Sequence, residues 1–316
     1  MPIPGNPLSY VNCYLLKGSD GWLMVDTGWN TDGAFNALEQ QLHILGLTFN
    51  QVSQIVVTHM HFDHFGLVGR IKQVSSAKVA YHRIEKEIIE TRLKNQQQLQ
   101  GQMREAMRSH GVPQAELDML PPHKAVAAMT DIVWPDRVLE DGDKVSTGLF
   151  NFRVILTPGH SRGHVCLYEP DRKLLFTGDH ILPITIPNIS YHAFSGPNPL
   201  ADFTHSLGEL RRLPVIRVFP AHRHVFVDLP KRIDEIFHHH EGRAGLILGT
   251  LKKGPSTAYK IASRIHWDIP DTTWATMVPN DRRSATSETL ANLEFLRAEG
   301  RVTSLAPKGV VRYCLV

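Results

Sequence analysis

Apolar and polar residues alternate along this chain with two periods, one typical of strands and one typical of helices. Short apolar runs bounded by turn residues predict strands over residues 10–16, 22–25, 54–57 and 78–81. Apolar residues at helical spacing predict helices over residues 32–46 and 67–74. Further strands are predicted over residues 138–145, 150–156, 165–169, 174–176 and 215–219, with a helix over 200–213. Strands that alternate with helices predict an α/β core, in which outer helices cover a sheet.

Residues 83–130 interrupt this pattern with a polar, glutamine-rich segment. We expect helices there, broken at residues 111–113 and 121–122, where glycine and proline occur. Two interpretations of this helical insertion stay open. It is either a solvated insertion without function or a lid over the functional site, because its methionines suit an adaptable apolar surface.

The last part of the chain, residues 231–316, has a different pattern. Helices are predicted over residues 231–252, 256–265 and 285–299, followed by strands over 301–305 and 310–315. Three helices and a terminal hairpin predict a winged-helix-like domain. Because 316 residues exceed the size of a typical single domain, we expect this domain to follow a core domain of residues 1–230. The run His238, His239 and His240 lies inside the first of these helices and is interpreted as part of the polar surface.

The composition is that of an ordinary soluble protein, with 42% hydrophobic and 21% charged residues. The formal net charge of +3 is too small to indicate a polyanionic partner by itself. Three scattered cysteines, Cys13, Cys166 and Cys314, argue against a disulfide framework. Neither a signal peptide nor an apolar run of the about 20 residues that a membrane span needs is visible. We therefore expect a cytoplasmic protein without a membrane partner. The 18 histidines are the one compositional sign of metal chemistry.

A dense group of metal-ligand residues follows the predicted strand over 54–57. His59, His61, Asp63 and His64 lie within six positions. Alternation along an extended backbone directs the first three to the same side, and a turn brings His64 to them. Neutral imidazole and carboxylate are ligands that zinc, manganese and iron accept. The segment therefore predicts a metal site.

Ligand-type residues also follow three other predicted strands. His160 comes after the strand over 150–156, Asp179 after 174–176 and His222 after 215–219. Side chains at the ends of adjacent strands converge in space, so we expect distant segments to build one metal pocket.

Taken in order, these motifs resemble those of the metallo-β-lactamase-fold hydrolases. They read Thr-His-Met-His-Phe-Asp-His at 58–64, Pro-Gly-His at 158–160, Gly-Asp at 178–179 and Ala-His at 221–222. The resemblance covers residues 8–225 apart from the insertion, and it implies an αββα sandwich with a dinuclear metal site at one edge. The C-terminal segment around residues 288–302 resembles the subgroup that contains the lactamase-β-like endoribonuclease.

The resemblance also implies a role for each of these residues. The implied metal ligands are His59, His61 and His160 for one ion, and Asp63, His64 and His222 for the other. Asp179 would bridge the two ions, and Asp63 would help to orient the nucleophile. That nucleophile would be a hydroxide between the ions, since metal coordination lowers the pKa of water to about 7. Two divalent ions are expected, with zinc first, while iron and manganese accept the same ligands.

Departures from the family pattern reduce the number of activities that we expect for this chain. One zinc subclass of true β-lactamases has cysteine where Asp179 stands, so antibiotic hydrolysis is disfavoured. The diiron flavoproteins have glutamate at the position of His61, and acyl-homoserine lactonases have tyrosine at the position of Leu182.

Three further residues beside the predicted ligands are candidates for the substrate or for support of the metal site. Arg162 and His164 either bind an anionic group of the substrate or pack the loop around His160. His180 follows Asp179 directly and is expected to support the metal ligands from behind.

Two functions fit this pattern. The first is hydrolysis of a small ester, thioester or lactone, similar to glyoxalase II, with the insertion as a lid. The second is cleavage of single-stranded RNA by a phosphodiesterase that holds its substrate with the winged helix. Residues 231–316 contain 13 Lys and Arg against 9 Asp and Glu, a modest surplus for an RNA-binding domain, so we favour a small-molecule substrate. A third interpretation makes this segment a packing or dimerisation module, which would give a homodimer.

Overall fold

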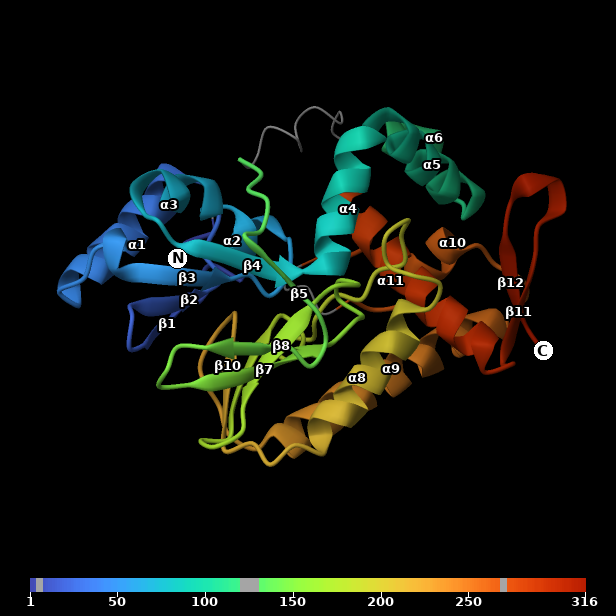
Figure 1. Ribbon diagram of the computed structural model, residues 1–316. Coiled ribbons are helices and arrows are strands. Elements are labelled where there is room, and N and C mark those ends of the chain that lie inside the picture. Colours follow the sequence, from blue (N-terminus) through green and yellow to red (C-terminus); the bar gives the residue numbers. More distant parts are fainter. Residues whose placement is uncertain (4–7, 120–130, 268–271) are drawn as a thin grey trace.

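Two five-stranded sheets pack face to face, and helices cover the outer face of each (Figure 1). The computed structural model describes residues 1–3, 8–119, 131–267 and 272–316. This α/β/β/α arrangement confirms the sandwich predicted from the sequence. No helix in the described ranges is long and apolar enough to cross a membrane.

The two sheets differ in the direction of their strands. The first has the order β1 (Tyr14–Lys17), β2 (Trp22–Val25), β3 (Val52–Val56), β4 (Lys78–His82) and β5 (Arg137–Leu139). The second has the order β10 (Arg217–Pro220), β9 (Leu174–Gly178), β8 (Val165–Glu169), β7 (Asn151–Leu156) and β6 (Lys144–Ser146). β2 to β5 are parallel, whereas in the second sheet β10 and β9 are parallel and the other neighbours are antiparallel. β7, β9 and β10 therefore run in the same direction and end at the same edge.

Apolar side chains fill all three layers between these elements. Leu23, Phe152 and Phe176 are buried between the two sheets. α1 (Asp32–Ile44) and α3 (Val68–Val74) pack on the outer face of the first sheet, and Leu38 and Leu42 of α1 face it because they lie four positions apart. On the second sheet the covering helices are α8 (Pro199–Arg211) and α9 (Leu229–Leu251). Two short helices, η1 (Phe49–Gln51) and α2 (Phe62–Phe65), flank β3.

Most predicted strands and helices of the core are confirmed with shifted ends, but the single strand expected over residues 138–145 is wrong. The chain instead forms β5 in the first sheet and β6 in the second, and it turns between them at residues 140–143. Gly142 adopts a φ of +80°, and the backbone amide of Glu140 donates to the Asp143 carboxylate at 3.1 Å. A glycine between two aspartates is a turn signal, and here it lets the chain cross from one sheet to the other.

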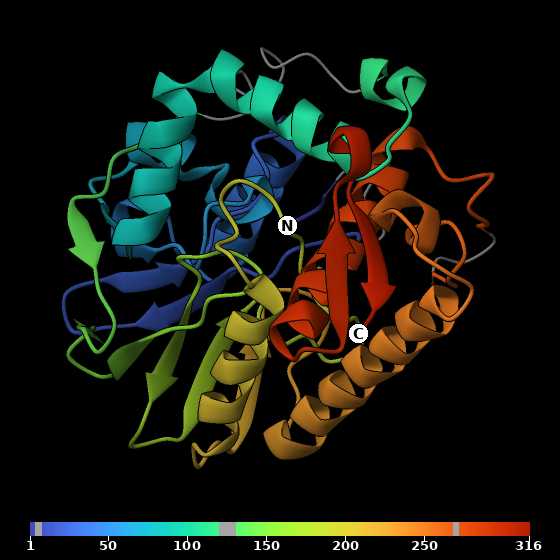
Figure 2. The same cartoon turned by 90° about the vertical axis from the view of Figure 1, so that its right-hand side faces the viewer.

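In its described residues, 83–119, the helical insertion contains α4 (Arg83–Lys94), α5 (Gln96–Ser109) and α6 (Gln114–Asp118). The predicted break at residues 111–113 is confirmed, with Gly111 at a φ of +93°, whereas the break at residues 121–122 lies outside the described residues. Met107, Val112 and Leu117 are buried in the core of the C-terminal segment, so the end of the insertion packs against residues far away in the sequence (Figure 2).

The described residues of the C-terminal segment form three α-helices and a hairpin whose connection contains a 3-10 helix. They are α9, α10 (Ala258–Ala262), α11 (Pro279–Ala298), β11 (Val302–Leu305), η2 (Pro307–Gly309) and β12 (Arg312–Leu315). α11 begins six positions before the predicted helix, and α10 is shorter than predicted. α9 spans the expected boundary at residue 230 and packs with its first half on the second sheet and with its second half in the C-terminal core. The winged-helix assignment and the division into two domains therefore stay predictions.

His240 corrects the interpretation of the three-histidine run as polar surface. Its side chain is buried, and its ring lies 5.6 Å from that of Phe203. Helical spacing explains this, because residue 240 falls on the same face of α9 as Ile233, Ile236 and Ala244. Burial lowers the pKa of His240 to about 3, so the ring is neutral.

Because α9 is shared by two cores, a cavity in it should lower the stability of the whole chain. Ile236 is 0% exposed and Leu246 is 48% exposed. We expect Ile236→Ala to lower the free energy of unfolding by about 2–5 kcal/mol, and Leu246→Ala on the same helix to change it by about 0.5 kcal/mol or less. Urea denaturation followed by circular dichroism measures both; equal effects would contradict the packing described here.

Candidate metal centre

The seven predicted ligands come together at one edge of the sandwich. After β3, the loop carries His59 and His61, and the short helix α2 carries Asp63 and His64. The loop after β7 carries His160. Asp179 follows β9 directly, and His222 lies two positions after β10. Because these strands end at the same edge, their loops converge, and the potential ligand atoms form two groups, each within 4.8 Å.

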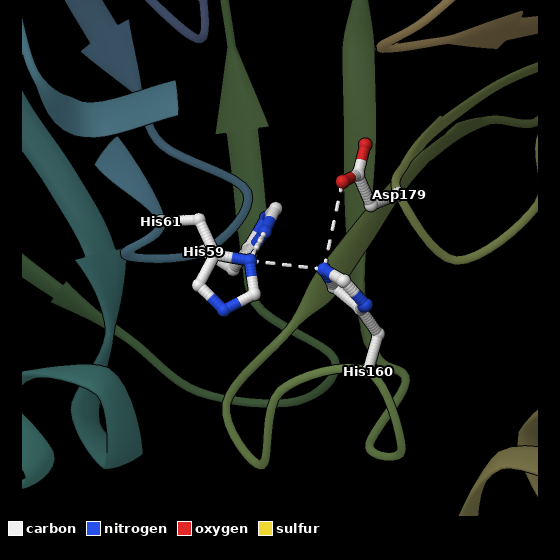
Figure 3. Close-up of side chains that lie close together, drawn as sticks. All are labelled: His59, His61, His160 and Asp179. Atoms are coloured by element: carbon white, nitrogen blue, oxygen red, sulfur yellow. Dashed lines mark hydrogen bonds and ion pairs between the residues drawn. The ribbon is translucent and has the colours of Figure 1, made fainter. Parts of the chain in front are cut away.

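The first group consists of three histidines and Asp179 (Figure 3). The Nδ1 atom of His61 lies 2.9 Å from Nε2 of His59 and 3.0 Å from Nε2 of His160. The Nε2 atom of His160 is also 3.5 Å from a carboxylate oxygen of Asp179. Three imidazole nitrogens and one carboxylate oxygen thus point toward one another, which is a donor set typical of a four-coordinate divalent ion.

The second group consists of Asp63, His64 and His222. The Nε2 atom of His222 lies 3.4 Å from Asp63 Oδ2, and that of His64 lies 3.7 Å from the same oxygen. Asp179 connects this group to the first, because its Oδ1 is 3.2 Å from His222 Nε2 and its Oδ2 is 3.5 Å from His64 Nε2. A carboxylate in this place can bind ions on both of its sides.

Unsatisfied polar atoms show that this space fits a cation. In the described part of the chain, His64 Nε2, His222 Nε2 and Asp179 Oδ1 are buried without a hydrogen-bond partner. Buried polar atoms of this kind are costly unless something binds them. All three belong to the groups above, so the residues present fit divalent metal ions. The nitrogen and oxygen donors suit zinc, iron or manganese alike.

Charge within the centre is divided between carboxylates and histidines. Burial raises the pKa of Asp179, but the charge of His64 and the nearby Nε2 of His222, at 3.2 Å, bring it well below its ordinary value. Burial lowers the pKa of His59 well below its ordinary value, and it lowers that of His61 to about 3. The carboxylate is therefore ionised and these two imidazoles are neutral, as metal binding requires. Burial lowers the pKa of His64 and His222, but the carboxylates of Asp179 and Asp63 outweigh it. They raise the pKa of His64 well above its ordinary value and that of His222 to about 9, so a bound ion would take the place of their Nε2 protons.

Asp26 orients His64, a role that the sequence did not reveal. One oxygen of its carboxylate accepts from the backbone amide of Thr58 at 2.8 Å, and the other lies 2.8 Å from Nδ1 of His64. Since Nδ1 donates to Asp26, Nε2 faces the centre, where a bound ion would take the place of its proton. Asp26 follows β2 with a φ of +58°, a left-handed conformation that aspartate tolerates better than most residues. The backbone oxygen of Asn188 orients His160 in the same way, at 3.0 Å from Nδ1.

Glu85 holds the two histidine loops together, and this role was also missed. It is 2% exposed and lies in the first turn of α4. Its carboxylate accepts from the backbone amides of Met60 at 3.1 Å and Gly163 at 2.8 Å, and from the hydroxyl of Ser161. The insertion thus begins with a residue that supports the metal loops.

The candidate residues beside the ligands have separate places. His164 is buried, its Nε2 accepts from the backbone amide of Asp179 at 3.2 Å, and its Nδ1 lies 2.8 Å from the Thr157 hydroxyl. It therefore supports the backbone of Asp179. His180 is buried against Phe203, with 4.7 Å between the ring centroids. Arg162 is exposed.

A glycine is required at position 178, where the end of β9 contacts His164. Its φ is +49°, and a Cβ atom there would lie 2.5 Å from His164 Nε2 and 2.9 Å from the hydroxyl of Thr58. Any side chain would displace the residues that position Asp179. This accounts for the Gly-Asp pair at 178–179.

The sequence comparison agrees with this geometry. The pattern of the metallo-beta-lactamase superfamily matches residues 6–222. The chain belongs to this superfamily.

Superfamily members with similar sequences or structures cover most of the chain. The probable metallo-hydrolase YqjP of Bacillus subtilis is 25% identical over 298 residues, which are 92% of this chain and 89% of that protein. The crystal structure of the metallo-beta-lactamase family protein TTHA1429 from Thermus thermophilus superposes with a TM-score of 0.85 at 31% identity, over 100% of this chain and 97% of that one. The acyl-coenzyme A thioesterase MBLAC2 of Bos taurus is 29% identical over 177 residues, which are 53% of this chain and 57% of that protein.

These relatives confirm the expectation of a metal-dependent hydrolase at the level of the superfamily. The roles of the individual ligands stay predictions, and two pairs of variants test them.

The first pair tests the number of metal ions. His222 is buried between Asp63 and Asp179, whereas His224 is exposed two positions further along. We expect the zinc-reconstituted protein to bind two ions per chain, His222→Ala to bind one, and His224→Ala to bind two. Elemental analysis after removal of free metal counts them, and at most one ion in the unaltered protein would contradict the assignment.

The second pair tests the support from α4. Glu85→Gln removes the charge that three donors share, whereas Glu87→Gln changes a surface residue on the same helix that pairs with Arg83. Loss of a group that orients metal ligands costs about 10–100-fold in metal affinity, so we expect Glu85→Gln to weaken zinc binding by this factor. Competition with a zinc chelator measures it, and equal affinities in the two variants would show that Glu85 is not needed.

Proposed function

We propose that this protein hydrolyses small acyl thioesters with two divalent metal ions, and that esters and lactones are poorer substrates. The observation that carries the proposal is the position of Asp179, within 3.5 Å of histidines from both ligand groups. A single carboxylate shared by two groups supports a two-ion hydrolytic site over a site with one structural ion. The 29% identity to an acyl-coenzyme A thioesterase supports the choice of thioesters.

Each residue of the centre has a defined part in this proposal. His59, His61 and His160 would hold one ion, Asp63, His64 and His222 the other, and Asp179 both. Bound ions would supply a water of lowered pKa as the nucleophile and positive charge for the carbonyl oxygen of the substrate. Asp26, Glu85, Asn188 and His164 keep the ligands in place. Zinc is the metal that we propose, because a histidine-rich set of nitrogen and oxygen donors is its usual environment.

The alternative, cleavage of single-stranded RNA, has less support from the C-terminal segment. Its presumed recognition helix is α11, and most of the middle of α11 is buried, including Thr289, Leu290 and Leu293. Residues 285–293 of this helix, apart from Glu288, are buried, so little of its middle is free to contact a nucleic acid. Arg282, a basic residue before the middle of this helix, donates to Glu116 at 2.7 Å and to the backbone oxygens of Trp274 and Ala275.

We also propose a cytoplasmic location. The three cysteines Cys13, Cys166 and Cys314 are free thiols in the structure, which suits a reducing compartment.

An activity panel tests the proposed function. Zinc-reconstituted protein is assayed with a butyryl thioester, the matching oxyester, a lactone and single-stranded RNA. We expect the thioester to be cleaved fastest, and Asp179→Asn to lower its kcat by at least about a hundredfold, as for loss of a central charge-stabilising group. Cys314→Ala in β12, far along the chain from the ligands, is the matched control and should keep full activity. Cleavage of RNA without cleavage of the thioester would decide for the alternative.

A further inference from the structure

The loop between β9 and α8 joins the metal centre to the C-terminal segment. Asn188 in this loop accepts from His160 through its backbone oxygen at 3.0 Å and donates to the Ser284 hydroxyl of α11 through its side chain at 2.8 Å. The backbone amide of Tyr191 donates to the backbone oxygen of Ser287 at 3.0 Å. Residues of this loop therefore lie beside both the metal ligands and the first turns of α11.

Arginines from three different elements surround the same loop. The guanidinium of Arg92, from α4, lies 4.8 Å from the ring centroid of Phe194. The side chain of Arg162, two positions after His160, lies within 4 Å of the place where a Cβ of Gly196 would be. Arg283 of α11 is next to Ser284, which bonds to Asn188. Within the described ranges, none of these arginines forms an ion pair with a carboxylate, and Arg283 donates to the amide oxygen of Asn280 at 2.8 Å.

His192 is an electrostatic neighbour of Arg92 and Arg283, and it carries no negative charge that could pair with them. Its Nδ1 accepts from the backbone amide of Phe194 at 3.2 Å, so the proton of the neutral ring is on Nε2, which can donate to a ligand. His192 is exposed, and partial desolvation together with the charges of Arg92 and Arg283 holds its pKa below the ordinary value. Both arginines are thus electrostatic neighbours of one imidazole N–H donor.

Nearby carboxylates do not neutralise this group. Glu85 acts on Arg92 at a distance, but its oxygens already accept from Met60, Ser161 and Gly163. Asp202 is the acidic neighbour of Arg162. The Nε atom of Arg283 is buried and finds no acceptor among the described residues, which is costly for a charged donor.

We propose that Arg92, Arg283 and His192 bind an anionic group, a phosphate or a carboxylate, on the thiol half of an acyl thioester. Planar guanidinium groups bind both anions through paired hydrogen bonds, and they do so best where few other acceptors compete. Arg162, two positions after His160, lies beside Gly196 of the same loop. The inference rests on the proposed function and assigns a binding site to the part of the substrate that lies away from the reacting carbonyl.

A binding experiment tests the subsite without turnover. Adenosine 3′,5′-bisphosphate and S-methylglutathione carry the two kinds of anion, and calorimetry measures their affinity for protein freed of metal, so that no ion contributes. Loss of charge-assisted hydrogen bonds should weaken binding by about tenfold or more in the double variant Arg92→Gln and Arg283→Gln. The matched control, Lys86→Gln with Arg297→Gln, removes the same charge from the same two helices, where these residues pair with Glu90 and Glu294. It should bind as the unaltered protein does.

A kinetic experiment then identifies the anion. Butyryl thioesters of coenzyme A, glutathione and N-acetylcysteamine have the same acyl group and carry phosphates, carboxylates and no charge, respectively. We expect the Arg92 and Arg283 double variant to raise KM about tenfold for one of the two anionic thioesters, and to raise it far less for the uncharged one.

The outcomes separate the two proposals. If neither anion binds the unaltered protein, or if the double variant and the control bind alike, the subsite is overturned. If KM rises equally for all three thioesters, the subsite is overturned as well. If an anion binds and the double variant loses it, but no thioester is cleaved by the metal-loaded protein, the proposed function fails and the anion subsite stands.

Discussion

A buried carboxylate among histidines, Asp179, is the constraint on which the rest of this structure depends. Moving one ionised group out of water costs several kcal/mol unless opposite charges and hydrogen bonds compensate. Asp179 is 7% exposed, and its compensation comes from His64 and His222, which belong to loops of two different sheets. The two sheets therefore have to meet with their loops in register at this edge. The helices outside them keep the sheets in that position.

The clustering of the candidate ligands could be predicted from the sequence because each of them is marked locally. His59, His61 and His64 stand in one short motif, and Asp179 and His222 each follow an apolar run that ends at the same edge. Strand direction alone then brings them together, without knowledge of side-chain packing. The same local signals gave the positions of most strands and helices of the sandwich.

Residues that act on distant backbone could not be predicted in this way. Glu85 resembles any glutamate in the first turn of a helix, and its partner Gly163 lies 78 positions further along. Asp26 resembles a turn aspartate, and its partner His64 is 38 positions away. His240 shows the same difficulty for burial, since a polar run gives no sign of which member faces the core. The turn at 140–143 could be recognised from a glycine between two aspartates. The sequence gives no sign, however, that the chain crosses from one sheet to the other there.

Asn188 has a consequence for how proteins of this architecture diverge. Its backbone oxygen sets the direction of the His160 ring, and its side chain is bonded to α11. We therefore expect a residue change in α11 that moves Ser284 also to rotate the ring of His160, a candidate ligand. Substitutions in the C-terminal segment that alter substrate preference would then also alter metal affinity. Changes in α11 that keep the protein active therefore need compensating changes in the loop at 182–198. Sequence drift in these two segments should be correlated across descendants of a common ancestor.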